Sequence, residues 1–391
     1  MTIFFKKIFL FMIPFVLVFL PPTAILFFAG EFYVPERVGE LARGSRVVIA
    51  GSAYSNIRGD YQLQETLYRQ PEIIALGTSR VGGFRSVFFK DPDIFYNDTG
   101  VGGALSNFRY FLEKISDHPP RIIIAGMDAY FFNPEEAKNN VVIRPDPFIE
   151  RVPWYGPFFS SLLQGGGWWR IYLDYADGKF TLQNVFRRDS AAVTRIGLRA
   201  VADGNGFLND GSNYFGDVIA DSSSQEKIRQ SIKRLSDSIS ESNGDEYGSD
   251  ISEDALAEVR RFLDTSRKNN IHVIGFIPPM ARAEYERLQS FHNASYAYAF
   301  NNLGKVLASV YKEYGFEFYD FTNIESFGGS DAEMVESKHG SEKLNLRLFI
   351  TMAEKSKRLG SLVDTVYLTN KLMNAKSTYE VFPLTINTAD L

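Results

Sequence analysis

The stretch Glu72-Ile-Ile-Ala-Leu-Gly-Thr-Ser-Arg80 decides how the fold of this sequence is interpreted. Its first five residues are mostly apolar, and the last four are a glycine, two hydroxyl residues and an arginine. A short apolar run that ends at a glycine predicts a buried strand leading into a turn. The stretch thus predicts a strand with polar side chains just beyond its carboxyl end.

Strands and helices alternate along the chain on both sides of this stretch. Further strands are predicted at 93–96, 121–125, 271–277 and 316–320, and helices at 104–115, 255–268 and 295–314. Because helices that connect parallel strands cover both faces of a sheet, this alternation predicts an α/β fold with a parallel sheet flanked by helices.

Residues 136–250 interrupt this alternation. They contain several prolines, the triplet Gly165-Gly-Gly167 and a final part rich in serine and aspartate. We interpret them as a large insertion with a helix at 224–240 and a loop at 241–250. The expected domains are a membrane segment at 1–30, a stalk or linker at 31–70, the α/β domain with its insertion at 71–360, and a C-terminal tail at 361–391.

The composition is that of a folded protein. Of the 391 residues, 45% are hydrophobic and 15% aromatic, which excludes a disordered or fibrous chain. The formal net charge of −5 gives no sign of nucleic-acid binding. The chain has no cysteine, which excludes thiol catalysis and disulfides. With four histidines (His118, His272, His292 and His339), we expect neither a metal centre nor another cofactor.

Residues 8–30 form a run of 23 positions without a charge, preceded by Lys6 and Lys7. A helix needs about 20 apolar residues to cross a bilayer, so the run predicts an N-terminal transmembrane helix. A cleavable signal sequence is the alternative, but its apolar core is usually shorter, and cleavage after Ala29 would put bulky Phe27 where small residues are favoured. A buried core helix fits poorly because the run has no polar face. We therefore expect an uncleaved anchor.

The orientation of this anchor depends on the basic residues at its ends. Lys6 and Lys7 precede the run, and three arginines follow it, at 37, 43 and 46. These counts nearly balance, but a short basic head before a first apolar run usually stays in the cytoplasm. We expect a single-pass protein of the inner (cytoplasmic) membrane with its body in the periplasm or outside.

Polar residues follow several predicted strands, at the edge where open parallel sheets bind ligands. Ser79 follows the first strand, a glycine-rich turn at 100–103 the second, and Asp128 the third. Alone, each has an ordinary structural explanation as a helix cap or a tight turn. A late loop adds His339 with Glu336 three residues before it, so that one turn lets the carboxylate orient the imidazole as in a serine triad. A lone loop histidine is more often simply solvated.

In order and sheet context, these four groups resemble the sequence blocks of the SGNH/GDSL hydrolase superfamily. The resemblance covers about 70–135 and 255–360. It implies a flavodoxin-like, SGNH hydrolase-like sheet. It also implies that Ser79 is the nucleophile, that His339 takes its proton, and that Glu336 orients the histidine.

The same resemblance assigns an oxyanion and substrate-binding group: Gly103, Asp128 and Arg80. The family usually has asparagine where Asp128 stands, and an ionised carboxylate would repel a forming oxyanion. Either Asp128 is protonated, or it faces elsewhere, or the hole consists of the backbone N–H groups of Ser79 and Gly103. The family also usually has aspartate where Glu336 stands, which changes the reach of that side chain.

Among membrane-tethered members, the chain resembles the SGNH-like proteins that work beside membrane-bound O-acyltransferases, such as the teichoic-acid D-alanylation protein DltD and the alginate O-acetylation proteins. The anchor, Gly77-Thr-Ser79 and Gly126-Met-Asp128 carry this looser resemblance. It implies a serine esterase or O-acyltransferase acting on acylated cell-envelope polysaccharide, with a membrane-bound O-acyltransferase as partner. Aromatic residues of the insertion suit stacking on sugars, although such residues are more often core: Trp154, Tyr155, Trp168, Trp169, Tyr172 and Tyr175.

Two other functions remain open from the sequence. A non-catalytic SGNH-fold accessory protein would bind glycan or scaffold an acyltransferase complex, and Asp128 at the oxyanion position favours it. An anchored carbohydrate-binding module without a triad would leave Ser79 and His339, which are 260 positions apart (339 − 79), far from each other in the fold.

Overall fold

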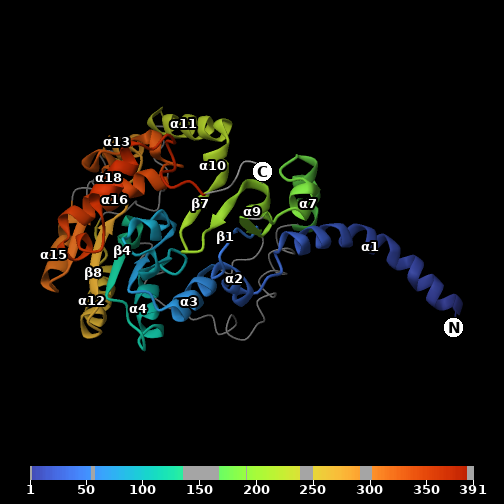
Figure 1. Cartoon of the computed structure of the whole chain (residues 1–391), viewed down its shortest axis with the longest axis horizontal. Coiled ribbons are helices and arrows are strands. Elements are labelled where there is room, and N and C mark those ends of the chain that lie inside the picture. The colour runs from blue at the N-terminus through green and yellow to red at the C-terminus, as the bar shows by residue number, and fades with distance from the viewer. Residues whose placement is uncertain are drawn as a thin grey trace. The chain divides into compact units, whose positions relative to one another are not determined.

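The structure, a computed structural model, describes residues 2–53, 58–134, 167–190, 192–237, 250–290 and 302–384. These residues belong to two compact units (Figure 1). The first unit comprises residues 1–57, 145–209 and 384–391, and the second comprises 58–144 and 210–383. The region expected to be one insertion is thus divided, and its part 145–209 joins the N-terminal segment in the first unit.

The second unit is built on a five-stranded parallel sheet. Its strands are β2 (Ile73–Leu76), β3 (Phe95–Asp98), β4 (Ile122–Gly126), β8 (His272–Ile277) and β9 (Glu317–Asp320). They lie in the order β3-β2-β4-β8-β9, and every neighbouring pair is parallel. Numbered along the chain, this order is 2-1-3-4-5, as in flavodoxin-like sheets. The parallel α/β sheet predicted from the sequence is confirmed.

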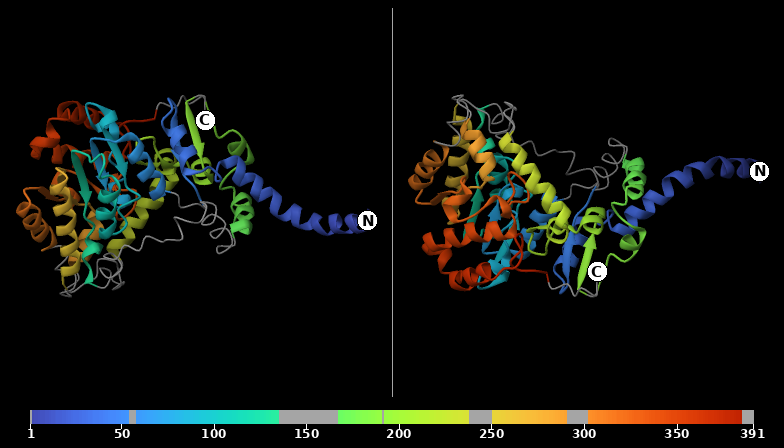
Figure 2. Two further views of the ribbon diagram at one scale, coloured as in Figure 1. Left: turned by 90° about the horizontal axis from the view of Figure 1, so that it is seen from below. Right: turned by 90° about the horizontal axis from the view of Figure 1, so that it is seen from above.

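Side chains of β2 alternate between two faces, each covered by helices. Ile74 and Leu76 pack with α4 (Leu105–Lys114), α12 (Glu253–Lys268) and α15 (Leu303–Glu313). Ile73 and Ala75 pack with α16 (Glu342–Lys355) and α18 (Thr365–Met373). In the left view of Figure 2, the strands run between the red C-terminal helices and the gold and orange ones. Because both faces are covered, all four residues of β2 are buried.

Shorter elements complete the second unit. They are α3 (Arg58–Arg69), β7 (Asn213–Phe215), α10 (Gly216–Ala220), α11 (Ser222–Asp237), α13 (Arg282–Ser290) and α17 (Lys357–Gly360). The expected C-terminal tail contains α18, whose Leu368 and Leu372 belong to the buried core. Most of the loop expected at 241–250, the start of the helix expected at 295–314, and His292 lie outside the described residues.

The first unit contains five helices and three short strands among the described residues. They are α1 (Thr2–Ala29), α2 (Pro35–Ala42), α7 (Gly167–Ala176), α8 (Leu182–Phe186), α9 (Leu198–Asp203), β1 (Val47–Ala50), β5 (Val193–Ile196) and β6 (Asn205–Phe207). β1 pairs with β5 in parallel and with β6 antiparallel. The segment expected to be a stalk therefore supplies α2 and β1 to this unit, and Val48 and Ile49 are buried.

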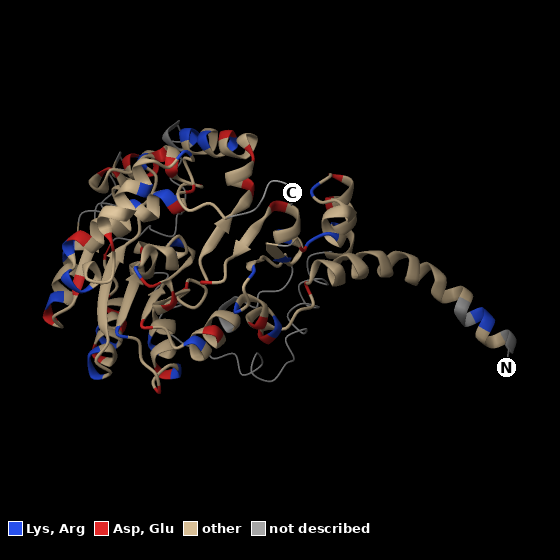
Figure 3. Ribbon diagram, viewed as in Figure 1, with Lys and Arg blue, Asp and Glu red and all other residues tan. Residues whose placement is uncertain are grey.

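Helix α1 is long and apolar enough to cross a membrane, and no other described helix is. Figure 3 shows charge on it only near its N-terminal end. Its other end belongs to the first unit: Leu26 and Ala29 are buried in a core cluster, and the Ala29 carbonyl accepts from the N–H of Gly197 over 2.7 Å. The end of α1 thus contributes to the core of this unit.

Candidate active site

The candidate site lies at the carboxyl edge of the parallel sheet, where the strand order reverses. From β2 the chain goes on to β3 on one side, and the later strands β4, β8 and β9 extend on the other. Such a reversal is the usual ligand site of open α/β sheets. Ser79 and Asp128 follow β2 and β4, the two strands that flank this point.

Ser79 and His339 are in direct contact at this edge. Ser79 Oγ lies 2.6 Å from Nε2 of His339, although 260 positions separate the two residues. Ser79 opens a 3-10 turn directly after β2, and Thr78 caps that turn. His339 lies in a loop whose backbone is closed on itself, since the N–H of Val335 donates to the His339 carbonyl over 2.9 Å. Both side chains are thus presented from short, hydrogen-bonded turns.

Glu336 contacts the other nitrogen of the His339 ring, with Oε1 paired to Nδ1. The side chain of His339 is 25% exposed and that of Glu336 55%. The hydrogen bond with His339 lowers the pKa of Glu336, although partial burial opposes this, so Glu336 is ionised at neutral pH. An ionised acceptor favours the tautomer with its proton on Nδ1, which leaves Nε2 free to accept from Ser79.

Arg80 and Asp128 form a second acid–base pair, and this one is buried. Nη1 of Arg80 donates to Oδ1 of Asp128 over 2.7 Å, and the two side chains are 6% and 0% exposed. The other oxygen of Asp128 accepts from the Thr78 hydroxyl over 2.7 Å. Both oxygens of Asp128 are thus directed to the turn after β2.

The remaining nitrogens of Arg80 bind three carbonyls from other segments. Nε donates to Lys338 over 3.1 Å, and Nη2 donates to Pro278 over 3.0 Å and to Pro279 over 2.7 Å. Arg80 thereby ties the turn after β2 to β4, to the end of β8 and to the histidine loop. Of the alternatives that the sequence left open for Asp128, the geometry matches the one in which it faces elsewhere, toward Arg80 and Thr78. Arg80, expected in the substrate-binding group, is instead engaged inside the protein.

The backbone of the glycine turn after β3 packs directly against the backbone of the turn after β2. A Cβ on Gly102 would lie 2.5 Å from Cα of Gly77, so only glycine fits there. The N–H of Gly103, expected as an oxyanion donor, instead donates to the carbonyl of Val101 over 3.0 Å. Among the described residues, the N–H groups of Ser79 and Gly102 donate to no protein acceptor.

Residues 210–213 support the turn that carries Ser79, a role that the sequence did not suggest. Nδ2 of Asn213 donates to the Ser79 carbonyl over 3.1 Å, and its backbone N–H donates to the Gly82 carbonyl over 2.7 Å. A Cβ on Gly82 would lie 2.1 Å from Nδ2 of Asn213, which explains the glycine. A polar loop in a presumed insertion gave no motif by which to find this contact.

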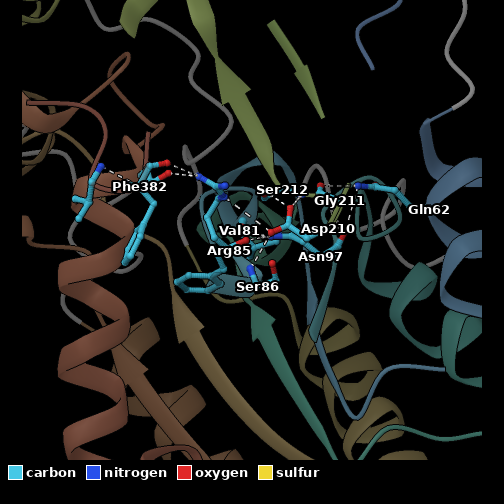
Figure 4. Close-up of polar contacts among 12 residues, drawn as sticks. Gln62, Val81, Arg85, Ser86, Asn97, Asp210, Gly211, Ser212 and Phe382 are labelled. Carbon is cyan, nitrogen blue, oxygen red and sulfur yellow. Dashed lines mark hydrogen bonds and ion pairs between the residues drawn. The ribbon is translucent and has the colours of Figure 1, made fainter. Parts of the chain in front are cut away.

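Figure 4 shows the polar network behind this turn. Asp210 accepts from the N–H of Ser86 over 2.8 Å and from the hydroxyl of Ser212 over 2.5 Å. Nε of Arg85 lies 3.9 Å from Oδ2 of Asp210. Although burial opposes the change, the Arg85 charge and these hydrogen bonds lower the pKa of Asp210. Arg85 also pairs with Glu342 on α16, so the network joins the turn to a core helix.

The aromatic residues expected to stack on sugars are not among the residues of this site. Trp168, Trp169, Tyr172 and Tyr175 are on α7 in the first unit, whereas Trp154 and Tyr155 lie outside the described residues. In the part of the chain that the structure describes, no group of three or more His, Asp or Glu side chains could hold a metal ion.

Comparison with known proteins returns no match: no family model, curated protein or solved structure matches this chain. The site itself consists of a contacting serine, histidine and carboxylate at the switch point of a parallel sheet, with a buried ion pair beside them.

Proposed function

We propose that this chain is a membrane-anchored serine esterase or O-acyltransferase of the SGNH type, acting on acyl groups of cell-envelope polysaccharide. The observation that carries the proposal is the 2.6 Å contact between Ser79 Oγ and Nε2 of His339, with Glu336 on the opposite ring nitrogen. Such a chain of contacts supplies a nucleophile, its base and the group that orients the base. The 2-1-3-4-5 strand order, with the serine after the first strand of the sheet, supports the same conclusion.

The reaction follows from these positions. Ser79 Oγ attacks the acyl carbonyl carbon, and Nε2 of His339 takes the hydroxyl proton. The tetrahedral intermediate expels the sugar oxygen, which receives that proton from His339, and an acyl ester remains on Ser79. Water or a sugar hydroxyl then attacks this ester with His339 again as base. Hydrolysis and transfer differ only in this second nucleophile.

The N–H groups of Ser79 and Gly102 are our candidates for stabilising the negative oxygen of the intermediate. Neither donates to a protein acceptor among the described residues, whereas the N–H of Gly103 is bonded to Val101. One oxyanion donor is typically worth about 2.7–4 kcal/mol in the transition state. Asp128 has no part in this step, because both of its oxygens accept from Thr78 and Arg80.

The rival function, a non-catalytic accessory protein, drew its support from a carboxylate at the oxyanion position. The ion pair with Arg80 accounts for Asp128 without any loss of catalysis. The same pair ties the serine turn to the histidine loop, since Arg80 also binds the Lys338 carbonyl. An enzyme needs that alignment, so the pair supports the enzyme over the accessory protein.

The location and substrate class rest on α1 and on the resemblance to membrane-tethered SGNH-like proteins. α1 is long and apolar enough to cross a membrane. Because two lysines precede its apolar run, we assign the N-terminus to the cytoplasm and the body to the periplasm or outside. Acylated envelope polysaccharide is the substrate available there, and a membrane-bound O-acyltransferase is the partner that would supply acyl groups.

The test uses the full-length chain, purified in detergent, with an aryl acetate as substrate. We expect the wild type to release the aryl alcohol and Ser79→Ala to release none above background. An added envelope-type oligosaccharide separates the two reactions: acetylated sugar indicates transfer, and free acetate alone indicates hydrolysis. Equal rates for the wild type and Ser79→Ala would refute the proposal.

A further inference from the structure

Two adjacent prolines, Pro21 and Pro22, interrupt the hydrogen bonds of α1, and α7 fills the gap. In an α-helix the carbonyl of residue i accepts from the N–H of residue i+4, and proline has no N–H. The carbonyls of Leu17 and Val18 therefore lose their helical donors. The hydroxyl of Tyr172 on α7 donates its one proton to the Val18 carbonyl over 2.7 Å, with the Leu17 carbonyl as a second, longer acceptor at 3.4 Å.

This replacement donor has its greatest value at the boundary of a bilayer. Water can satisfy a freed carbonyl at a protein surface, but hydrocarbon cannot, so each unsatisfied backbone group there is costly. Tyrosine and tryptophan are enriched at membrane interfaces because one end of each side chain is apolar and the other polar. α7 carries four such residues: Trp168, Trp169, Tyr172 and Tyr175.

Aromatic contacts fix α7 and α8 to α1. The rings of Phe19 and Trp168 meet edge to face at 5.8 Å, and those of Phe28 and Phe186 at 5.0 Å. Ile171 of α7 is fully buried in the cluster that also contains the end of α1. These helices are thus packed against the anchor at its C-terminal half.

Several large apolar side chains of these helices are exposed, beside the ion pair of Arg170 with Asp174. Trp169 is 66% exposed, Leu173 43%, Phe186 60% and Phe27 62%. Trp169 and Leu173 are four residues apart, so they lie on the same side of α7. Exposed groups of large apolar side chains are typical of interaction surfaces.

The length of α1 relates this surface to a bilayer. The candidate spanning segment runs from Phe4 to Ala29, and its 26 residues extend over about 39 Å at about 1.5 Å per residue. The hydrocarbon core of a bilayer is about 30 Å thick. The segment is therefore longer than the core, and its end at Phe28, which contacts Phe186 on α8, lies at a membrane surface.

We propose that α7 and α8 form a membrane-contact platform, in which Trp169, Leu173 and Phe186 face the lipid of the bilayer that α1 crosses. Lipid is the occupant because ring contacts hold this surface against the spanning helix: Trp168 meets Phe19, and Phe186 meets Phe28. Tyr172 completes the backbone of α1 beside this surface. The platform is independent of the chemistry at Ser79.

The test exploits the absence of cysteine from the sequence. Leu173→Cys and, as matched control, the exposed Asp177→Cys are each introduced into the full-length chain, labelled with a nitroxide and reconstituted in phosphatidylcholine vesicles. Collision of the label with oxygen reports lipid, and collision with a water-soluble nickel chelate reports water. We expect the oxygen-to-nickel collision ratio to be several-fold higher at 173 than at 177.

Equal, water-like ratios at both positions in vesicles would overturn the platform. So would protection of position 173 that requires a second protein rather than lipid. A further variant, Tyr172→Phe, removes the donor while keeping the ring, and Tyr175→Phe is its control. We expect only Tyr172→Phe to lower the ratio at 173, because α7 then loses its polar attachment to α1.

Discussion

Two acid–base pairs meet at the carboxyl edge of the same sheet, and they differ in exposure. His339 and Glu336 are 25% and 55% exposed, whereas Arg80 and Asp128 are 6% and 0% exposed. Consecutive residues serve the two pairs, because Ser79 contacts the exposed one and Arg80 belongs to the buried one. The comparison assigns the chemistry to the pair that a substrate can reach and the alignment to the pair that it cannot.

Exposure also decides what each pair contributes to stability. Breaking a buried ion pair leaves an uncompensated charge and costs about 3–5 kcal/mol, whereas an exposed pair contributes about 0–1 kcal/mol. Substitutions at the exposed pair should therefore reduce activity and spare the fold. Substitutions at the buried pair should reduce stability first.

The largest expected effect is on catalysis, from Ser79→Ala. Loss of the nucleophile should lower ester turnover by about 10³-fold or more, because removal of any triad member leaves only binding and oxyanion stabilisation. The midpoint of thermal unfolding should not change, since His339 is the one hydrogen-bond partner of the hydroxyl among the described residues. Activity and unfolding are measured on the same preparation, with Ser86→Ala, a half-buried serine nearby, as control. Retained turnover would remove Ser79 from the mechanism.

The next effect is on stability, from Asp128→Asn. Considered by family position alone, this change would restore an oxyanion donor and leave or raise activity. The structure instead predicts a loss of stability. Arg80 loses its counter-charge inside the protein, so the free energy of unfolding falls by about 3–5 kcal/mol. Chemical denaturation measures the change.

A double variant sharpens this prediction. Arg80→Met with Asp128→Leu removes both charges, so it should be less destabilised than Asp128→Asn alone. Its activity should still be reduced, because the bonds from Arg80 to Lys338, Pro278 and Pro279 are lost. Stability unchanged in the single variant would show that the buried pair does not hold the turn.

Glu336→Gln should separate activity from stability within the exposed pair. The amide no longer selects the tautomer that leaves Nε2 free, so turnover should fall by about 10²–10⁴-fold. Unfolding free energy should change by less than about 1 kcal/mol, because the carboxylate is half exposed. Glu325→Gln, another exposed carboxylate in an ion pair, is the matched control. Equal turnover in the two variants would contradict an orienting role.

The smallest effect is the pH dependence of the contribution that Glu336 makes to the free energy of unfolding. The folded pKa of Glu336 is lowered by His339, so its contribution is fully present above the ordinary carboxyl pKa of about 4.3. It is lost as the pH falls through the lowered folded value. The small difference in unfolding free energy between the wild type and Glu336→Gln should therefore be smaller in acid, which denaturation at pH 7 and pH 3 would detect. A difference that grows in acid would have the wrong sign.

The sequence predicted the sheet and the place of the serine because both depend on local patterns. The apolar runs ending in Gly77 and Gly126 needed no tertiary information to be recognised as buried strands. β3 begins two residues later than expected, at Phe95, since Asp93 and Ile94 belong to a 3-10 turn that Asp91 caps.

Contacts between distant side chains could not be predicted in the same way. That Asp128 faces Arg80 depends on β2 and β4 being neighbours and on the direction of each side chain beyond the strand end. The Asn213 contact with Ser79 joins the start of β7, a segment without a motif, to the nucleophile turn. The strands of the first unit are four residues or fewer, and β5 contains Arg195, so no apolar run marked it.

One measurement tests the central claim most directly: labelling of the full-length chain with a fluorophosphonate, followed by mass spectrometry of the modified peptide. Fluorophosphonates react with serines whose hydroxyl is activated by a base. The account predicts one phosphonylated residue, Ser79, with labelling lost in His339→Ala and retained in Ser86→Ala. Folded wild-type protein that stays unlabelled at Ser79, or that labels equally well without His339, would contradict it.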